Sequence, residues 1–481
     1  MHAVVVGGGV AGLGTALSLS RRGHRVTVLE RDDTPMPDSP AAAFAWDRRG
    51  APQVRHSHAL LGRLHNLLRD EHPDVLTALL DAGATEIRQA DRMPDTLDDR
   101  TPMPGDEDLT LIASRRTTFE WVLRRAVLGT DGVEVRTGVA VSGLCGDRTA
   151  AVPHVDGVVL DDGTVLGADL VVAANGRRST VPDWLADIGV TMPDEEVEDT
   201  GIVYASRFFE LEPGEAYPGT DRLVGGDLTY LKYGVFWGDN DTFSLTLAID
   251  ADDTVLRNAI KDPAVFDAIG RQIPSVAPWL DGRAHAITEV HSMAGLLNRR
   301  RRFVVDENPV VTGLVAVGDA HVCTNPLYGR GCSTGMWQAD LLARAADDHG
   351  TDAASLAVAY DAAVNDQVEP WYRSSVDSDR SARRAIARAK AVAAGEDVPE
   401  ESGEQMKRSI LREGLSPATR TDAVVWRAFC RTMNLLAPPN HLLEPDIGAR
   451  VMKVWQDRAN RPPEPPLGPP REEMLAAVGV G

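Results

Sequence analysis

Glycines and a carboxylate near the N-terminus have the types and spacing that bind a dinucleotide. Gly7, Gly9 and Gly12 occupy the G-x-G-x-x-G positions, and Glu30 ends the next apolar run. The first glycine allows a tight turn, the second lets a pyrophosphate approach the backbone, and the third lets a helix and a strand pack closely. A carboxylate at position 30 can accept hydrogen bonds from both ribose hydroxyls and would repel a 2′-phosphate. These residues predict a site for FAD or NAD and exclude NADP there.

A second group with chemical potential lies far downstream. Asp319 follows the apolar run Leu314 to Val317, and Pro326, Gly329 and Gly331 come after it. A carboxylate at a strand end can accept hydrogen bonds from a ribityl chain, which a nicotinamide nucleotide lacks. Pro326 keeps a helix from starting early, while the two glycines clear side chains from the start of the next helix. The positive end of that helix would favour the charge of a reduced flavin, so the two groups together predict FAD.

Regular elements must position both groups at one edge of a sheet. Ala3 to Val6 and Arg25 to Leu29 read as buried strands around an apolar helical face. Because α/β folds bind ligands beyond the carboxyl ends of parallel strands, we expect an α/β fold with a Rossmann-like FAD-binding domain. The chain would build this domain from two pieces, residues 1–195 and 298–345.

Two further regions are expected around the FAD-binding domain. Residues 196–297 contain strand-like runs, which predict an antiparallel β-sheet that forms a substrate wall. Residues 346–481 read as a helical region with a proline-rich tail along the surface. From the aromatic residues on the predicted strands and on the second motif we expect a substrate pocket that includes Tyr204, Phe236, Trp237 and Tyr328.

Composition limits the partners and the compartment. The 481 residues carry a net charge of −21, which disfavours nucleic acid and anionic membranes because both repel acidic proteins. No long apolar run predicts a membrane span, and a strand that begins at Ala3 leaves no room for a signal peptide. The four cysteines show no C-x-x-C spacing, so we expect a soluble cytoplasmic protein. His56 and His58 lack a carboxylate or thiol at ligand spacing, and no metal is expected.

Several segments carry a resemblance to a known family. The GD-x6-P-x2-G-x-G pattern around Asp319 looks like that of the FAD-dependent monooxygenases, whose best-known members hydroxylate aromatic rings. Four more segments resemble the branch that contains squalene and polyether-type epoxidases: residues 50–58, 116–120, 200–207 and 325–329. By this resemblance Arg55 and Arg116 face the phosphates or the ribityl chain of FAD, and Arg31 lies beside the adenosine.

The resemblance also implies an activity. Reduced FAD would react with O2 to a peroxyflavin, and one oxygen atom would pass to a small apolar organic substrate, by epoxidation of an alkene or hydroxylation of an arene, in secondary metabolism. The electrons would come from NAD(P)H. Where the aromatic hydroxylases carry an Asp-Gly pair that contacts the nicotinamide, this chain has Asn175-Gly176. Electron delivery therefore stays open between direct reduction and a separate flavin reductase, and no catalytic side chain is assigned.

Three other functions share this sequence pattern. An FAD-dependent reductase or dehydrogenase of the geranylgeranyl-reductase type would work without oxygen. A flavin-dependent halogenase needs a lysine in its FAD domain, and the first lysine here is Lys232. A non-enzymatic flavin-binding protein would hold FAD without responding to reductant and oxygen.

Overall fold

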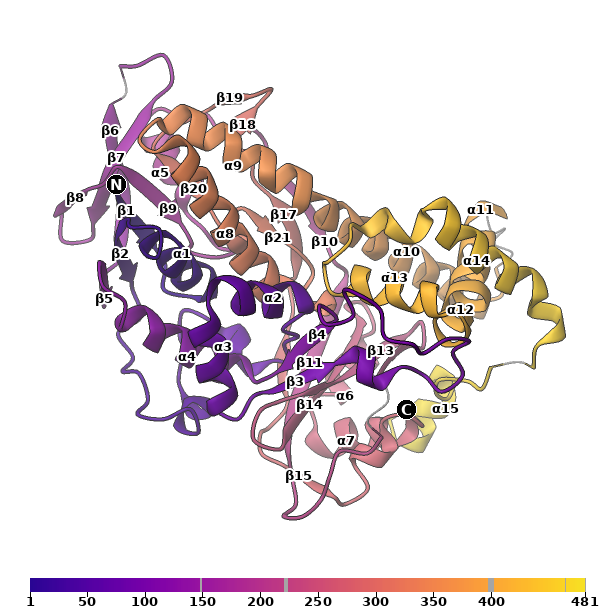
Figure 1. Cartoon of the computed structure of the whole chain (residues 1–481). Coiled ribbons are helices and arrows are strands. Elements are labelled where there is room, and N and C mark those ends of the chain that lie inside the picture. The colour runs from indigo at the N-terminus through magenta and orange to yellow at the C-terminus, as the bar shows by residue number, and fades with distance from the viewer. Residues whose placement is uncertain (148, 220–223, 397–401, 463, 481) are drawn as a thin grey trace.

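Five parallel strands form the sheet that carries the first glycine motif. A computed structural model describes residues 1–147, 149–219, 224–396, 402–462 and 464–480 (Figure 1). The strand order is β20 (Leu314–Ala316), β9 (Leu170–Ala173), β1 (His2–Val6), β2 (Arg25–Glu30) and β5 (Val133–Thr137). Every neighbouring pair is parallel. The carboxyl ends of β1, β2, β9 and β20 therefore meet at one edge, where both predicted motifs lie.

Both faces of this sheet are covered, which explains why its strands β1, β9 and β20 are almost entirely apolar. Ala3 and Val5 belong to the core that includes the helix α1 (Val10–Ser20). Val4 and Val6 pack instead with residues of an antiparallel layer, β6 (Val141–Asp147), β7 (His154–Leu160) and β8 (Val165–Gly167). The helices α4 (Arg116–Leu128) and α8 (Gly331–His349) both contact α1.

A second, antiparallel sheet lies within residues 202–293. Its order is β12 (Val224–Asp227), β13 (Leu231–Trp237), β14 (Thr242–Asp250), β11 (Ile202–Leu211) and β15 (Ala284–Ala286), and β16 (His291–Met293) also pairs with β11. Phe243 of β14 packs on Trp279, with ring centroids 4.9 Å apart. On this side the sheet shares its core with α7 (Pro263–Gln272), and α6 (Thr254–Ala259) contacts β14.

A small sheet joins the two parts of the molecule. β10 (Glu196–Asp199) pairs with β17 (Leu297–Arg300), which pairs with β21 (Val322–Cys323). This small sheet lies where the chain leaves the part that contains the parallel sheet and returns to it, and the predicted domain boundaries are at 195 and 298. The segments between these sheets contain seven shorter elements: α2 (Gly62–Glu71), α3 (Pro73–Asp81), β3 (Thr85–Arg88), β4 (Thr110–Ala113), α5 (Val181–Asp187), β18 (Val304–Val305) and β19 (Asn308–Pro309).

The C-terminal region is helical, as predicted. It contains α9 (Ala353–Gln367), α10 (Glu369–Ala393), α11 (Ser402–Ser409), α12 (Ser416–Thr421), α13 (Ala423–Met433), α14 (Pro445–Gln456) and α15 (Arg471–Ala477). Figure 1 shows α10 to α14 at the end of the molecule away from β1. The predicted α/β class with an antiparallel second sheet and a C-terminal helical region is confirmed.

The proline-rich tail packs on the second sheet. The Tyr230 hydroxyl donates to the Pro469 carbonyl (2.8 Å), and Arg471 pairs with Asp253 (2.8 Å). Among the described residues, no helix is both long enough and apolar enough to span a bilayer.

Candidate active site

The loop after β1 leaves space on one side only. Gly7 has φ +115°, and a Cβ there would lie 2.5 Å from the Ala174 carbonyl oxygen. A Cβ on Gly12 would lie 1.9 Å from the Gly7 carbonyl oxygen. A Cβ on Gly9 would meet no atom of the described residues within 4 Å. The loop is therefore closed against the protein at Gly7 and Gly12 and open at Gly9, as the approach of a pyrophosphate requires.

The start of α1 is open in the same way. Gly9 is its N-cap, and no described side chain caps the first turn. Backbone N–H groups at a helix start bear partial positive charge and bind anions. This end of α1 thus fits a phosphate group.

Glu30 ends β2 with a buried carboxylate. Its Oε2 atom accepts from the Gly8 backbone N–H (3.1 Å) and from Arg48 (3.2 Å), while Oε1 accepts from the Asp32 N–H (2.9 Å). A carboxylate oxygen can accept two hydrogen bonds. Oε1 therefore keeps the capacity to accept from a ribose hydroxyl.

Arg48 forms ion pairs with three carboxylates next to this loop. This residue was not predicted from the sequence. Its side chain is 1% exposed and reaches Glu120 (2.7 Å), Asp32 (2.7 Å) and Glu30 (3.2 Å). Burial raises the pKa of Glu120, but Arg116 and Arg48 outweigh it and the pKa is lowered. No motif marks Arg48, since its partners lie far from it in the sequence.

The arginines expected at FAD have different surroundings. Arg116 is buried, donates to Glu120 (3.0 Å), and lies 3.4 Å from the His58 Nε2 atom. Arg55 is half exposed, with its guanidinium 3.4 Å from Asp47. Arg31 is exposed at the end of β2. Of the three arginines, Arg116 is thus buried, whereas Arg31 and Arg55 are exposed.

The second motif forms a tight turn beside α1. Gly318 has φ +60°, and a Cβ there would lie 2.7 Å from the Ala11 Cβ. Asp319 follows it, half-buried. Burial raises the pKa of its carboxyl, while Arg116 and Arg177 act in the opposite direction. Arg116 and Arg177 are therefore both close enough to Asp319 to influence its charge.

The start of α8 is also open. A Cβ on Gly331 would meet nothing within 4 Å in the described chain, and no described side chain caps the helix. Gly329 adopts φ +65°, where a Cβ would lie 2.9 Å from the Ala59 Cβ. Pro326 is exposed in the turn before them. The starts of α1 and α8 are thus both left uncovered by described side chains.

Asn175 and Arg177 follow β9, at the carboxyl edge of the parallel sheet. The Asn175 Oδ1 atom is buried without a hydrogen-bond partner in the described part of the chain. A buried oxygen without a donor is costly, so a ligand donor is expected there. Arg177 contacts the Met293 sulfur (3.8 Å). Its charge opposes the burial that raises the pKa of Asp319, and it adds to the burial that lowers the pKa of His56. Arg177 was not among the residues expected at the site.

A pocket lies between the second sheet and the turn before α8. It has a cavity volume of about 70 Å³ and is lined by Ser57, Tyr204, Lys232, Tyr233, Gly234, Phe236, Thr246, Pro326 and Leu327. Two residues of the predicted pocket, Tyr204 and Phe236, are among them. The aromatic ring of Tyr204 also packs edge-on against His56, with centroids 4.7 Å apart.

The other two residues of the predicted pocket are placed elsewhere. Neighbours in a strand point to opposite faces, so Phe236 and Trp237 cannot share one pocket. Trp237 stacks on Tyr217 on the sheet face opposite the pocket, with ring centroids 5.0 Å apart. Tyr328 donates its hydroxyl to Asp379 of α10 (2.8 Å).

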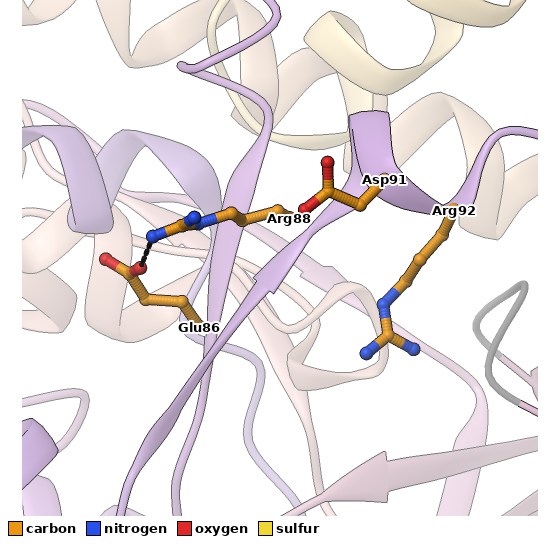
Figure 2. Close-up of a pocket in the computed structure, with 4 residues that line it drawn as sticks. All are labelled: Glu86, Arg88, Asp91 and Arg92. Atoms are coloured by element: carbon orange, nitrogen blue, oxygen red, sulfur yellow. Dashed lines mark hydrogen bonds and ion pairs between the residues drawn. The ribbon is translucent and has the colours of Figure 1, made fainter.

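A larger depression is charged and lies behind the sheet. Glu86, Arg88, Asp91 and Arg92 line it, and Figure 2 shows Arg88 reaching Glu86 (2.8 Å). The Arg92 guanidinium lies over the Trp237 ring, 4.6 Å from its centroid. Such a lining does not suit an apolar molecule, and the depression is separate from the flavin motifs.

Comparisons with known proteins agree with this geometry. Residues 2–100 match the family model of FAD dependent oxidoreductases. The chain is 29% identical to protein Rv3254 of Mycobacterium tuberculosis over 72% of each chain. It is also 28% identical to the FAD-dependent monooxygenase OpS4 of Beauveria bassiana, over 50% of this chain and 53% of that protein.

The structural comparison extends over most of the chain. The crystal structure of PqsL, described as a probable FAD-dependent monooxygenase from Pseudomonas aeruginosa, superposes with a TM-score of 0.57 at 18% identity. It covers 82% of this chain and 99% of PqsL. The chain is an FAD-dependent oxidoreductase. Its fold is that of the flavin monooxygenases.

The residues of this oxidoreductase fit the cofactor. Within the described chain, no atom lies near the open side of Gly9 or Gly331, no side chain caps the start of α1 or α8, and the buried oxygen of Asn175 lacks a donor. Within the described ranges, no cluster of histidine, cysteine and carboxylate side chains could hold a metal ion.

Proposed function

We propose that this oxidoreductase is a monooxygenase that transfers one oxygen atom of O2 to a small apolar organic substrate. The observation that carries the proposal is the composition of the pocket. Pro326 and Leu327, in the turn that leads to Gly329 and Gly331, line the same pocket as Tyr204 and Phe236. A substrate between these aromatic rings would thus lie beside the start of α8.

Different parts of FAD would be bound by different side chains and helix ends. The start of α1 at Gly9 would bind the pyrophosphate, Glu30 the ribose and Asp319 the ribityl chain, with Arg116 nearby. Arg31 and Arg55 would close the outer edge. Bound FAD, once reduced, would supply the electrons that activate O2.

The remaining tasks of the protein would be to exclude water and to orient the substrate. The uncapped start of α8, with its positive partial charge, would stabilise the negative charge of the reduced cofactor. Tyr204 and Phe236 would keep water from the reacting atoms and hold an alkene or an arene, and the product would be an epoxide or a hydroxylated ring. Such a reaction suits secondary metabolism. The free cysteines fit a cytoplasmic location.

Electron delivery is proposed to need NAD(P)H, chiefly through a separate flavin reductase. Asn175 contributes no charge where the aromatic hydroxylases carry an aspartate. We expect NADPH alone to bleach the FAD-loaded protein slowly under anaerobic conditions, and a flavin reductase to accelerate this. Rapid bleaching by NADPH without a reductase would contradict this part.

The test of oxygen transfer uses an isotope. The FAD-loaded protein is reduced anaerobically with dithionite, then mixed with isotopically labelled O2 and a panel of terpenoid alkenes and fused arenes. Mass spectrometry should find a product that carries one labelled oxygen atom. Saturation of a prenyl substrate in the absence of oxygen would identify a reductase instead, and unlabelled products throughout would refute the proposal.

A further inference from the structure

The strand register places a row of hydroxyl groups on one face of the second sheet. Ser206 of β11 is opposite Thr246 of β14, which is opposite Gly234 of β13. Ser244 lies two residues before Thr246, on the same face. Phe236 is opposite Ser244. This face therefore combines hydroxyls with the Phe236 ring that lines the pocket.

The segment 56–58 completes a continuous hydrogen-bonded chain on this face. The His56 Nδ1 atom lies 3.3 Å from the Ser206 hydroxyl, which lies 2.7 Å from the Thr246 hydroxyl. Thr246 donates to Ser57 (2.6 Å), and Ser57 donates to Ser244 (2.7 Å). Apart from Ser57, whose side chain is partly exposed in the pocket, these residues are buried.

The geometry sets the direction of this chain. Because the Thr246 proton goes to Ser57, the Thr246–Ser206 bond must use the Ser206 proton. The Ser206–His56 bond then uses the Nδ1 proton of His56. Each hydroxyl has one proton and two lone pairs. The protons of Ser206, Thr246 and Ser57 are thus all committed inside the chain.

The hydroxyl groups that face the pocket can therefore still accept hydrogen bonds but have no proton left to donate. Ser57 and Thr246 each accept one hydrogen bond within the chain, which leaves each with one free lone pair, and both line the pocket. Gly234, opposite Thr246, has no side chain to cover that hydroxyl. Burial, together with His291 and Arg177, lowers the pKa of His56 to about 3, so its ring is neutral.

We propose that Ser57 and Thr246 recognise one O–H or N–H donor on an otherwise apolar substrate. This inference rests on the proposed function and deepens it, because it names the polar group that the substrate carries. A ketone or an ether would find only lone pairs at these two hydroxyls. Lys232, also in the pocket lining, is the competing donor, and it is held in an ion pair with Asp227 (3.3 Å).

Binding of matched probes tests the inference without oxygen or electrons. The oxidised, FAD-loaded protein is titrated with 2-naphthol, 2-methoxynaphthalene and naphthalene, and in a second series with 4-pentylphenol and its methyl ether. Perturbation of the flavin spectrum reports the Kd. We expect the hydroxyl probe to bind about fivefold more tightly than its ether, the scale of one hydrogen bond.

Two variants and one control assign that preference to the hydroxyls. Thr246→Val and Ser57→Ala should each bring the ratio of the two Kd values close to one. Ser57→Ala lies outside the sheet and stays informative if Thr246→Val unfolds. Thr312→Val removes a hydroxyl that bonds the His154 ring (3.0 Å) and should leave the ratio unchanged.

The outcomes separate this inference from the proposed function. Equal binding of phenol and ether, a ratio that survives both variants, a preference for the ether through Lys232, or no binding of any probe would each overturn the donor recognition. Lost preference together with intact labelled-oxygen transfer would overturn only this inference. A clear preference without oxygen transfer would overturn only the proposed function.

Discussion

At the scale of single residues, one guanidinium holds the acidic cluster at the end of β2 together. Arg48 is the shared partner of Glu30, Asp32 and Glu120, all of them buried. Several buried carboxylates so close together would repel one another without a cation. Arg48 therefore belongs to the stability of the FAD-binding part before any cofactor arrives.

Replacement of Arg48 should destabilise the apo-protein. We expect Arg48→Met to lower the free energy of unfolding by about 3–5 kcal/mol, because it leaves buried charges without a partner. Urea denaturation measures this change. Arg31→Met, at an exposed neighbouring position, should change it by less than about 0.5 kcal/mol, and equal effects of the two substitutions would contradict the assignment.

Asp319 provides the matching prediction for the cofactor. Asp319→Ala should weaken FAD binding by about 1.5–3 kcal/mol, the scale of a hydrogen bond to a charged group. Equilibrium titration of the apo-protein with FAD measures the Kd, and Asp319→Asn, which keeps one carbonyl oxygen, should lose less. Unchanged FAD affinity in the alanine variant would refute the role of the carboxylate.

At the scale of elements, two helix starts converge on one region because glycines let them approach. α1 and α8 pack together, and a Cβ on Gly14 would lie 2.3 Å from the Met336 sulfur. The same helices leave their first N–H groups free at Gly9 and Gly331. The two helices therefore pack closely in the middle while their starts stay uncovered by the described residues.

Alanine substitutions at Gly12 and Gly9, two glycines of one loop, should affect different quantities: the first the free energy of unfolding, the second the affinity for FAD. Gly12→Ala meets the Gly7 carbonyl oxygen and should lower the apo-protein's free energy of unfolding by about 1–3 kcal/mol, the scale of overpacking. Gly9→Ala meets no described atom and should leave that quantity unchanged, yet weaken FAD binding about tenfold or more, because the methyl group occupies the side that faces the pyrophosphate. Thermal melts and FAD titrations of both variants decide this, and full FAD affinity in Gly9→Ala would count against the site.

At the scale of the whole molecule, the C-terminal helices are tied to the cofactor side by a buried carboxylate. Asp379 of α10 accepts from Asn298 (2.6 Å), Asn325 (2.9 Å) and Tyr328 (2.8 Å). Asn298 belongs to β17, and the other two residues lie in the turn before α8. The helical region in Figure 1 is thus connected to both the linking sheet and the flavin motif.

Buried neutral histidines should make the fold sensitive to acid. Burial and Arg21 lower the pKa of His72 to about 4, below the ordinary value of 6.5. Between these two values the unfolded chain binds a proton that the folded chain does not, so stability is complete above pH 6.5 and is lost as the pH falls toward 4. His56, His58 and His321 behave alike, with pKa values of about 3, 3 and 4.

A substitution at His72 isolates one such contribution. Between pH 6 and pH 5 the wild type should lose about 1 kcal/mol more unfolding free energy than His72→Gln. Urea denaturation at both pH values gives the difference, in which all other titrating groups cancel. Parallel pH curves for the two proteins would show that His72 is not buried in neutral form.

Patterns within short segments were enough to predict the strand–helix–strand unit, both glycine motifs and FAD as the cofactor. The spacing of Gly7, Gly9 and Gly12, or of Asp319 and Gly331, dictates a local backbone whatever the rest of the chain does. Contacts between distant segments carried no such signal. Arg48 finds Glu120 only because α4 packs beside the loop, and Ser57 meets Thr246 only through the fold. Trp237 and Phe236 look alike in the sequence, but the sheet sends them to opposite faces, because register and packing, not residue type, choose the partners of a side chain.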